Sequence, residues 1–378
     1  MPKKQNKYKM SIIGKLVFLI NIFAIGLLFL SYISVYINPG TFPLPAFAGL
    51  SYPIILSINL VFIILWFYIR PRFILLSAIA IIIGWNHIAQ LMPINSDQEI
   101  PKETTTLKIL SFNVQNFLKV NITNTKYISD FENQNEILEY IQSKDADIVF
   151  LQEFLYDREK IKDFTKWFGK EIKCQYSHTR NYFQRKDNKL DAIAIFSKFP
   201  IINKGHHEFD KKTIAVYADI VMDKDTVRAY NLHLASIHLK KEDYDFISEI
   251  DIQQNKEEIR NASRAVASKV KAAFIKRGKQ VEIAKNILKE SPFPIIVCGD
   301  FNDTPVSYTY HSLTKELKDA FVESGSGFGN TYAGKNFPAL RIDYILHDKI
   351  FKSINFKRDK IHLSDHYPIS CVLYKNLN

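Results

Sequence analysis

The side chains of this chain that are best suited to chemistry are polar residues in or at the ends of short apolar runs, each typical of a β-strand. They comprise carboxylates, amides and imidazoles: Asn113, Glu153, His233, Asp300, Asn302, Asp343, Asp365 and His366. Any one of them alone is more often a turn, cap or structural residue. Their recurrence after many separate strands favours one shared site, because sheet proteins build sites at strand ends.

The residue types suit hydrolysis of a phosphate ester. Mg²⁺ takes oxygen ligands, usually one or two carboxylates together with water and substrate phosphate. Ester cleavage also needs an activated water in line with the leaving oxygen, and groups that stabilise charge on the non-bridging oxygens. Carboxylate, amide and imidazole side chains supply these functions. The sequence lacks a Gly-rich loop followed by Lys-Ser/Thr, which argues against P-loop nucleotide chemistry.

The elements that must position these residues alternate between short strands and helices. The helices are predicted at Glu132–Gln142, Asp163–Gly169 and Glu257–Glu290, with a possible break at Gly278. Strands are predicted at Leu107–Asn113, Asp147–Gln152, Ala192–Ser197, Ile214–Met222, Val227–Leu234, Pro294–Cys298, Ile342–Leu346 and Ile369–Tyr374. This alternation predicts an α/β domain.

The chain before this domain is strongly apolar. A membrane-spanning helix needs roughly 20 mostly apolar residues, and Ser11–Ile37, Leu44–Ile69 and Phe73–Met92 meet that need. A cleaved signal peptide is the alternative for the first segment, but its apolar core is too long and further apolar segments follow. We therefore expect a membrane region with about three transmembrane helices at residues 1–94, a linker at 95–106 and the α/β domain at 107–378.

The basic residues predict an orientation. The lysine-rich N-terminus belongs inside, the uncharged Asn38–Pro43 connection outside, and Arg70–Arg72 inside again. Three crossings then place the α/β domain outside the cytoplasm. If Phe73–Met92 does not span, the domain faces the cytoplasm instead.

Net charge and cysteines constrain the function less. The formal charge of +11 fits a polyanionic partner or an anionic membrane surface, or an ordinary lysine-rich surface. Cys174, Cys298 and Cys371 form no CxxC pair, which argues against a disulfide framework and a structural zinc site.

The motifs carry a family resemblance. Ser-Phe-Asn113-Val, Leu-Gln-Glu153, Asn-Leu-His233-Leu, Gly-Asp300-Phe-Asn302, Arg-Ile-Asp343-Tyr and Ser-Asp365-His366-Tyr resemble, in order, the motifs of the endonuclease/exonuclease/phosphatase superfamily. This superfamily includes deoxyribonuclease I and bacterial sphingomyelinases. The resemblance runs from about Leu107 to Tyr374. It implies a four-layer α/β/β/α sandwich, like that of deoxyribonuclease I, with the site at one end of the sheets.

The resemblance also implies a metal site. Glu153 would be the main Mg²⁺ ligand, with Asn113 beside it and Asp365 near the metal. Mn²⁺ is a possible substitute for Mg²⁺.

The other matched residues would handle water and phosphate. Asp300 would position or activate the attacking water, and Asn302 would hold a phosphate oxygen. His366 would act as general base or phosphate contact, oriented by Asp343. His233 would contact phosphate or protonate the leaving group.

Two segments depart from the family pattern. Arg180–Asp191 is basic and contains Tyr182, a candidate for a catalytic tyrosine, but a solvated loop is the favoured interpretation. Lys240–Ile259 is strongly charged and fits a lid, a partner surface or an exposed helix.

These observations predict a membrane-anchored, Mg²⁺-dependent phosphoesterase. Its substrate would be nucleic acid, which the positive charge favours, or a phospholipid or sphingolipid headgroup, which membrane tethering favours. The alternative is a non-catalytic scaffold or binding subunit of a membrane complex with the same fold.

Overall fold

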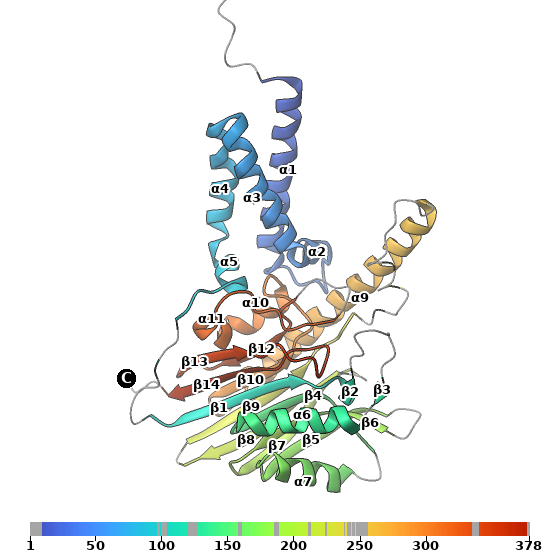
Figure 1. Ribbon diagram of the computed structural model, residues 1–378, viewed down its shortest axis with the longest axis vertical. Coiled ribbons are helices and arrows are strands. Elements are labelled where there is room, and N and C mark those ends of the chain that lie inside the picture. Colours follow the sequence, from blue (N-terminus) through green and yellow to red (C-terminus); the bar gives the residue numbers. More distant parts are fainter. Residues whose placement is uncertain are drawn as a thin grey trace, which may run out of the picture.

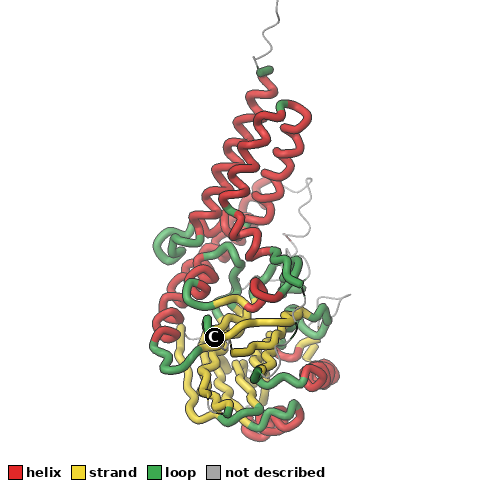
Figure 2. Tube along the Cα trace, turned by 90° about the vertical axis from the view of Figure 1, so that its left-hand side faces the viewer, coloured by secondary structure: helices red, strands yellow, loops and turns green. Residues whose placement is uncertain are grey.

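The computed structural model describes residues 10–96, 99, 104–119, 128–129, 131–157, 161–184, 189–210, 213–223, 225–237, 239, 243, 246, 256–334 and 340–375. A bundle of apolar helices stands on a layered α/β body (Figures 1 and 2). The end of α1 nearer the N-terminus lies at the tip of the bundle that is remote from this body.

The bundle contains α1 (Ile12–Ser34), α2 (Leu44–Leu50), α3 (Tyr52–Ile69), η1 (Pro71–Phe73), α4 (Ile74–Ile83) and α5 (Trp85–Leu91). By length and composition, α1 and α3 can each cross a membrane. The η1–α4 segment and α5 pass the same test only as a pair, which is bent by 62°. The second predicted membrane segment, Leu44–Ile69, forms two helices, α2 and α3, which are separated at Ser51. Pro53 lies in the first turn of α3, where proline is well tolerated.

Buried polar side chains hold the bundle together. Asn21 of α1 donates to Ser77 Oγ of α4 at 2.7 Å and accepts from Trp66 Nε1 of α3 at 2.8 Å. Asn59 of α3 donates to the carbonyl of Ala24 at 3.2 Å. Between helices in a membrane such bonds contribute modestly, on the order of 1 kcal/mol each, because polar groups of the separated helices also find hydrogen-bond partners.

The α/β body contains two six-stranded sheets. The first has the order β13-β14-β1-β4-β6-β5 and the second β11-β12-β10-β9-β8-β7. The strands of the first sheet are β1 (Thr106–Asn113), β4 (Ile148–Asp157), β5 (Tyr176–Gln184), β6 (Lys189–Ser197), β13 (Phe351–Arg358) and β14 (Ile369–Lys375). Those of the second are β7 (Ile201–Asp210), β8 (Thr213–Met222), β9 (Asp225–His233), β10 (Ile295–Asp300), β11 (Lys318–Asp319) and β12 (Asp343–His347). A small separate pair is formed by β2 (Leu118–Lys119) and β3 (Ile128–Ser129).

Three apolar cores separate four layers. The central core packs the two sheets against each other, with residues such as Ile109 and Ile296. The second packs the first sheet against α6 (Phe131–Lys144) and α7 (Ile161–Glu171), and the third packs the second sheet against α9 (Lys256–Lys289) and α10 (Tyr308–Thr314). This arrangement confirms the expected α/β/β/α sandwich. The short helices η2 (Gln115–Phe117) and α11 (Ala320–Ser324) lie in connections.

The bundle contacts the α/β body directly. Arg341, which is buried, donates to the carbonyl of Gln90 in α5 at 3.1 Å. Asn38, in the connection after α1, donates to the carbonyl of Gly278 in α9 at 3.3 Å. Phe47 of α2 packs edge-on against Phe274 of α9, with ring centroids 5.2 Å apart. These contacts fix the orientation of the body relative to the bundle.

The predicted strands and helices of the α/β domain are all present, with small shifts at their ends. Gly278 lies within one continuous helix, α9. The interpretation of Arg180–Asp191 as a solvated loop is wrong for the described part, because residues 180–184 belong to β5 and 189–191 to β6, and the two strands pair. Of the charged segment Lys240–Ile259, most lies outside the described residues.

Candidate active site

Strand pairing in the second sheet gathers three of the predicted residues. Asp300, the last residue of β10, lies opposite His233 at the end of β9 and opposite Asp343 at the start of β12. All three side chains are buried. The register therefore places two carboxylates and an imidazole at one end of this sheet.

Backbone geometry fixes the residues around Asp300. Gly299 has a φ of +138°, and a Cβ on it would lie 1.9 Å from the carbonyl oxygen of Leu232 in β9, so only glycine fits there. Asn302 has a φ of 53°, which asparagine tolerates better than most residues. The Asn302 backbone N–H donates to Asp300 Oδ1 at 2.8 Å, and its side-chain amide donates to the carbonyl of Leu234 at 3.0 Å.

The first sheet contributes Asn113 and Glu153. Asn113 ends β1 opposite Gln152 of β4, and the register of β4 with β6 shifts between Leu151 and Phe154. Glu153 lies in this irregularity with a φ of 50°, as is common where a bulge redirects a side chain toward a site. Asn113 Nδ2 lies 3.4 Å from Glu153 Oε1 and 3.1 Å from Asp300 Oδ2.

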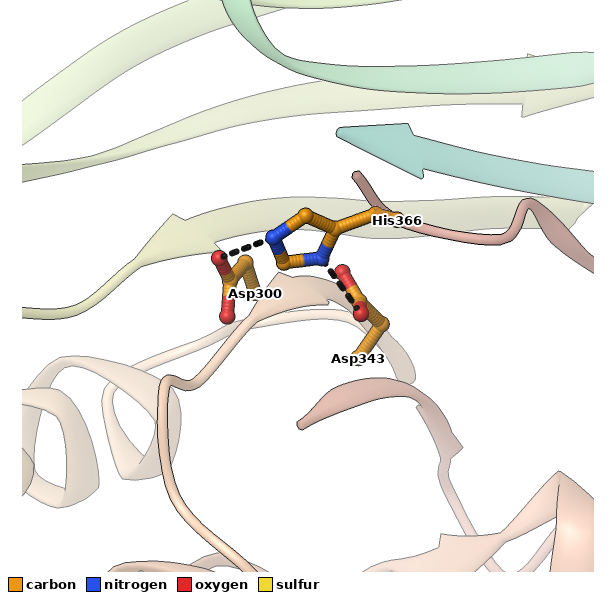
Figure 3. A group of neighbouring side chains, drawn as sticks. All are labelled: Asp300, Asp343 and His366. Carbon is orange, nitrogen blue, oxygen red and sulfur yellow. Dashed lines mark hydrogen bonds and ion pairs between the residues drawn. The ribbon is translucent and has the colours of Figure 1, made fainter. Parts of the chain in front are cut away.

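His366 lies between two carboxylates (Figure 3). Its Nδ1 is 2.9 Å from Asp343 Oδ2, and its Nε2 is 3.8 Å from Asp300 Oδ2. The Nε2 atom also lies 3.9 Å from Asp365 Oδ1. The Asp343 carboxylate accepts a hydrogen bond from Nδ1–H of His366 and holds the ring in place. The Nε2 atom on the other side of the ring is therefore directed at Asp300 and the site.

A second histidine, His233, also lies beside Asp300. His233 Nε2 lies 3.8 Å from Glu153 Oε1 and 3.9 Å from Asp300 Oδ2. The ring of Tyr182 in β5 packs edge-on against the His233 ring, with centroids 5.9 Å apart. The Tyr182 ring therefore adjoins one of the predicted site residues.

The site concentrates negative charge in a buried place. Burial and the neighbouring carboxylate of Asp343 raise the pKa of Asp300. Burial raises the pKa of Asp365 to about 6. The pKa of His366 is raised well above its ordinary value because Asp343 and Asp300 outweigh the effect of burial. Shifts of this kind are typical of functional sites.

The donor set fits a divalent cation. Ligand atoms of Asp300, Asp343 and His366 lie within 4.8 Å of one another. Glu153 adds a further carboxylate, and the Asn113 amide lies between Glu153 and Asp300. The buried Asp343 Oδ1 has no hydrogen-bond partner among the described residues. Oxygen-rich carboxylate and amide sets suit hard cations such as Mg²⁺. A cavity of about 190 Å³ opens here, lined by Glu153, Asp300, Asn302, Asp365 and His366 among others.

Sequence reasoning missed several residues that support the site. Asn116 donates to Glu153 Oε2 at 3.4 Å from a backbone with φ 57°. Thr331 Oγ accepts from the backbone N–H of Asp343 at 3.0 Å, and Tyr332 packs edge-on against His366 at 5.3 Å. Of these three residues, only Asn116 could have been found from the sequence, because it is a second amide three residues after Asn113. Thr331 and Tyr332 lie in an irregular segment that no periodicity identifies.

Comparisons with known proteins identify the family of the chain. A model of the Endonuclease/Exonuclease/phosphatase family matches residues 110–366, and a model described as a domain of unknown function (DUF8431) matches residues 14–91. No similar sequence was found among curated proteins.

Solved structures share the fold. One is an endonuclease/exonuclease/phosphatase from Beutenbergia cavernae, 15% identical, with a TM-score of 0.50 and 72% of each chain covered. Another is the catalytic domain of human Nocturnin with bound sulfate, 16% identical, with a TM-score of 0.50 and 72% of this chain and 95% of that one covered. At this identity they establish the fold alone. Because the family model covers most of the length of this chain, the chain belongs to the endonuclease/exonuclease/phosphatase family.

Proposed function

We propose that this protein is a membrane-anchored, Mg²⁺-dependent phosphoesterase that hydrolyses phosphodiester or phosphomonoester bonds. The observation that carries the proposal is the convergence of Asn113 and Glu153 from one sheet with Asp300 from the other. His366 and its carboxylate partner Asp343 adjoin the same point. A water, a phosphate and a cation all find suitable partners within this set.

In the proposed assignment, Glu153 and Asn113 hold the divalent cation, and Asp365 lies near it. The bound cation would polarise the phosphate and neutralise charge that develops on its oxygens. Mg²⁺ is the expected ion, and Mn²⁺ is a possible substitute because it accepts similar oxygen ligands. The excess of carboxylates over cationic side chains at the site supports a bound cation.

The remaining residues handle the water and the phosphate. Asp300, whose pKa is raised, is suited to accept a proton from the attacking water. The His366 ring, held by Asp343, presents Nε2 as a donor to phosphate or as the alternative proton acceptor. His233 is placed to contact phosphate or to protonate the leaving oxygen. One N–H of the Asn302 side-chain amide donates to the carbonyl of Leu234. We propose that the other N–H donates to a phosphate oxygen.

The domain division and orientation belong to the same proposal. We assign residues 1–94 to the membrane region, 95–106 to a linker and 107–378 to the catalytic domain. In Figure 1, α1 and α4–α5 run toward the catalytic domain and α3 runs away from it. With the bundle embedded, this arrangement supports three crossings and a catalytic domain on the side of the membrane opposite the basic N-terminus, outside the cytoplasm.

The substrate is proposed as a class. Nucleic acid and phospholipid or sphingolipid headgroups both present the scissile bond that the site accommodates. The competing role, a non-catalytic scaffold, leaves the buried carboxylates and histidines unexplained, because burial of unneutralised charge is costly.

The proposal is tested by hydrolysis with the full chain in detergent. Bis(p-nitrophenyl) phosphate, plasmid DNA and sphingomyelin are offered with Mg²⁺ or with chelator. We expect Mg²⁺-dependent turnover of at least one substrate and its loss in His366→Ala. The matched control is His362→Ala, which changes an exposed histidine four positions earlier. Absence of turnover on every substrate would favour the scaffold.

A further inference from the structure

A second cavity, of about 620 Å³, lies where the bundle meets the catalytic domain. It is lined by Val35 and Tyr36 at the end of α1, by the last turns of α9, by α10 and by Ile295 at the start of β10. Asp300 ends the same strand, so at about 3.3 Å per residue the cavity lies roughly 17 Å along β10 from the active site. It is therefore a separate site.

The cavity has a basic rim. Lys285, Lys289, Lys315 and Lys349 line it, against the acidic Glu316 and Asp348. Lys285 pairs with Glu282 at 3.1 Å and Lys349 with Glu316 at 3.5 Å. Lys289 and Lys315 are exposed and form no ion pair with any residue that the structure describes. Their charge is available to an anion.

The cavity also has an apolar floor. Leu288, Leu313 and Leu317 are buried beneath the lysines. Phe293, Ile295 and Val35 extend this apolar lining. Water-soluble anions gain nothing from such a surface, whereas an amphiphile buries part of its apolar body there.

The cavity lies at the end of the bundle that faces the catalytic domain. Tyr36 follows the last residue of α1 by two positions and is 67% exposed. Its ring packs edge-on against His311 of α10, with centroids 4.8 Å apart. Tyrosine is enriched where helices leave the hydrocarbon for the headgroup layer. With α1 embedded in the bilayer, the cavity opens at headgroup depth.

We infer that this cavity binds the phosphate-bearing headgroup of an anionic membrane lipid, with Lys289 and Lys315 contacting the phosphate and the leucine floor contacting the glycerol and first chain carbons. Basic pockets beside transmembrane helices are suited to such headgroups. The inference rests on the membrane embedding proposed above, but not on the proposed catalysis. A lipid held here would join the bundle and the catalytic domain, because α1, α9 and α10 all line the cavity.

The test measures lipid binding by the detergent-solubilised full chain through its thermal unfolding midpoint. The probes are dioctanoyl phosphatidylglycerol, dioctanoyl phosphatidylcholine and inorganic phosphate, each titrated alone. The variant Lys289→Glu/Lys315→Glu is compared with the wild type. Its matched control is Lys166→Glu/Lys170→Glu, which reverses two exposed lysines on α7, at the far end of the molecule from the bundle (Figure 1).

We expect the anionic lipid to raise the midpoint of the wild type and of the control. Its apparent affinity for Lys289→Glu/Lys315→Glu should be roughly tenfold or more weaker, because each lysine near an anionic surface contributes on the order of 1 kcal/mol. Equal stabilisation by phosphatidylcholine would overturn the inference. So would equal stabilisation by inorganic phosphate, or equal weakening in both variants.

Two further measurements distinguish a failure of the lipid-binding inference from a failure of the proposed embedding or of the proposed catalysis. If alkaline carbonate extracts the protein from membranes, the proposal that the helical bundle is embedded in the bilayer is refuted. Hydrolysis of bis(p-nitrophenyl) phosphate by Lys289→Glu/Lys315→Glu should equal that of the wild type, since the cavity lies away from Asp300. A hydrolysis assay that fails for both proteins counts against the catalytic proposal and leaves the lipid titration intact.

Discussion

Asn113 and Asp300 form a hydrogen bond of 3.1 Å between the ends of strands that belong to different sheets. The two residues are 187 positions apart in the chain. Because the bond crosses the interface of the sandwich, the relative position of the two sheets determines the geometry of the site. Any change that shifts one sheet against the other must therefore affect the proposed cation and water positions together.

The first prediction concerns the cation. Asn113→Ala removes an amide from the assigned cation site and the cross-sheet bond to Asp300. We expect the Mg²⁺ concentration for half-maximal hydrolysis to rise about 10- to 100-fold, as for loss of groups that support a metal site. Asn203→Ala, on the edge strand β7, is the control and should keep the wild-type Mg²⁺ requirement. An unchanged requirement in Asn113→Ala would remove Asn113 from the assignment.

The second prediction concerns the histidine–carboxylate pair. Asp343→Asn removes the charge that orients and stabilises protonated His366. We expect the turnover number to fall on the order of 10²- to 10⁴-fold, with a smaller change in the Michaelis constant. Asp348→Asn, in the turn after β12, is the control. A turnover number within a few-fold of wild type in Asp343→Asn would show that the pair does not act in catalysis.

The third prediction concerns the contact between the bundle and the catalytic domain. Buried Arg341 pairs with buried Asp319 and donates to the carbonyl of Gln90. Arg341→Met leaves the Asp319 carboxylate uncompensated, and we expect a loss of roughly 3–5 kcal/mol in the free energy of unfolding. The added change Asp319→Asn should recover part of that loss. Thermal unfolding in detergent measures both variants, and a wild-type midpoint for Arg341→Met would contradict the assigned role.

The fourth prediction concerns pH. His178, in β5, donates from Nε2 to the carbonyl of Gly205 at 3.0 Å, and burial lowers its pKa to about 4. In the unfolded chain the pKa is about 6.5. Between these values the unfolded chain binds a proton that the folded chain does not, so stability is full above pH 6.5 and falls as the pH drops toward 4.

After allowance for the partial exposure of His178, we expect this contribution to be at most about 2 kcal/mol. In His178→Gln, unfolding midpoints measured between pH 4 and 6.5 should therefore decline less steeply than in the wild type. An identical decline in both proteins would assign the acid sensitivity to other groups.

The sequence predicted the interior of the sheets better than their edges. The predicted strands are central or well buried, and they carry the polar residues that end them. Of the strands that the sequence did not predict, β5, β7, β11 and β13 lie at the edges of the two large sheets, and β2 and β3 form the separate pair. The burial pattern of β7, for example, is largely half-exposed or exposed, so the strand lacks the apolar run that identifies a strand in a sequence.

Within the site, the sequence identified the residue types but not their backbone geometry. Glu153 occupies a positive φ at a register shift, and that shift depends on how β4 pairs with β6, which local residues do not encode. The Tyr182 contact with His233 likewise depends on the packing of the two sheets. Such relations arise from tertiary structure and cannot be read from propensity.

The central claim is that residues of both sheets share one divalent cation and one phosphate. A crystal structure of the protein with Mn²⁺ and phosphate, with the anomalous signal of Mn²⁺ recorded, tests it most directly. We expect a Mn²⁺ peak bound by Glu153 beside Asn113, and a phosphate that contacts Asn302 and His366. A Mn²⁺ peak elsewhere, or a phosphate out of reach of these side chains, would contradict it.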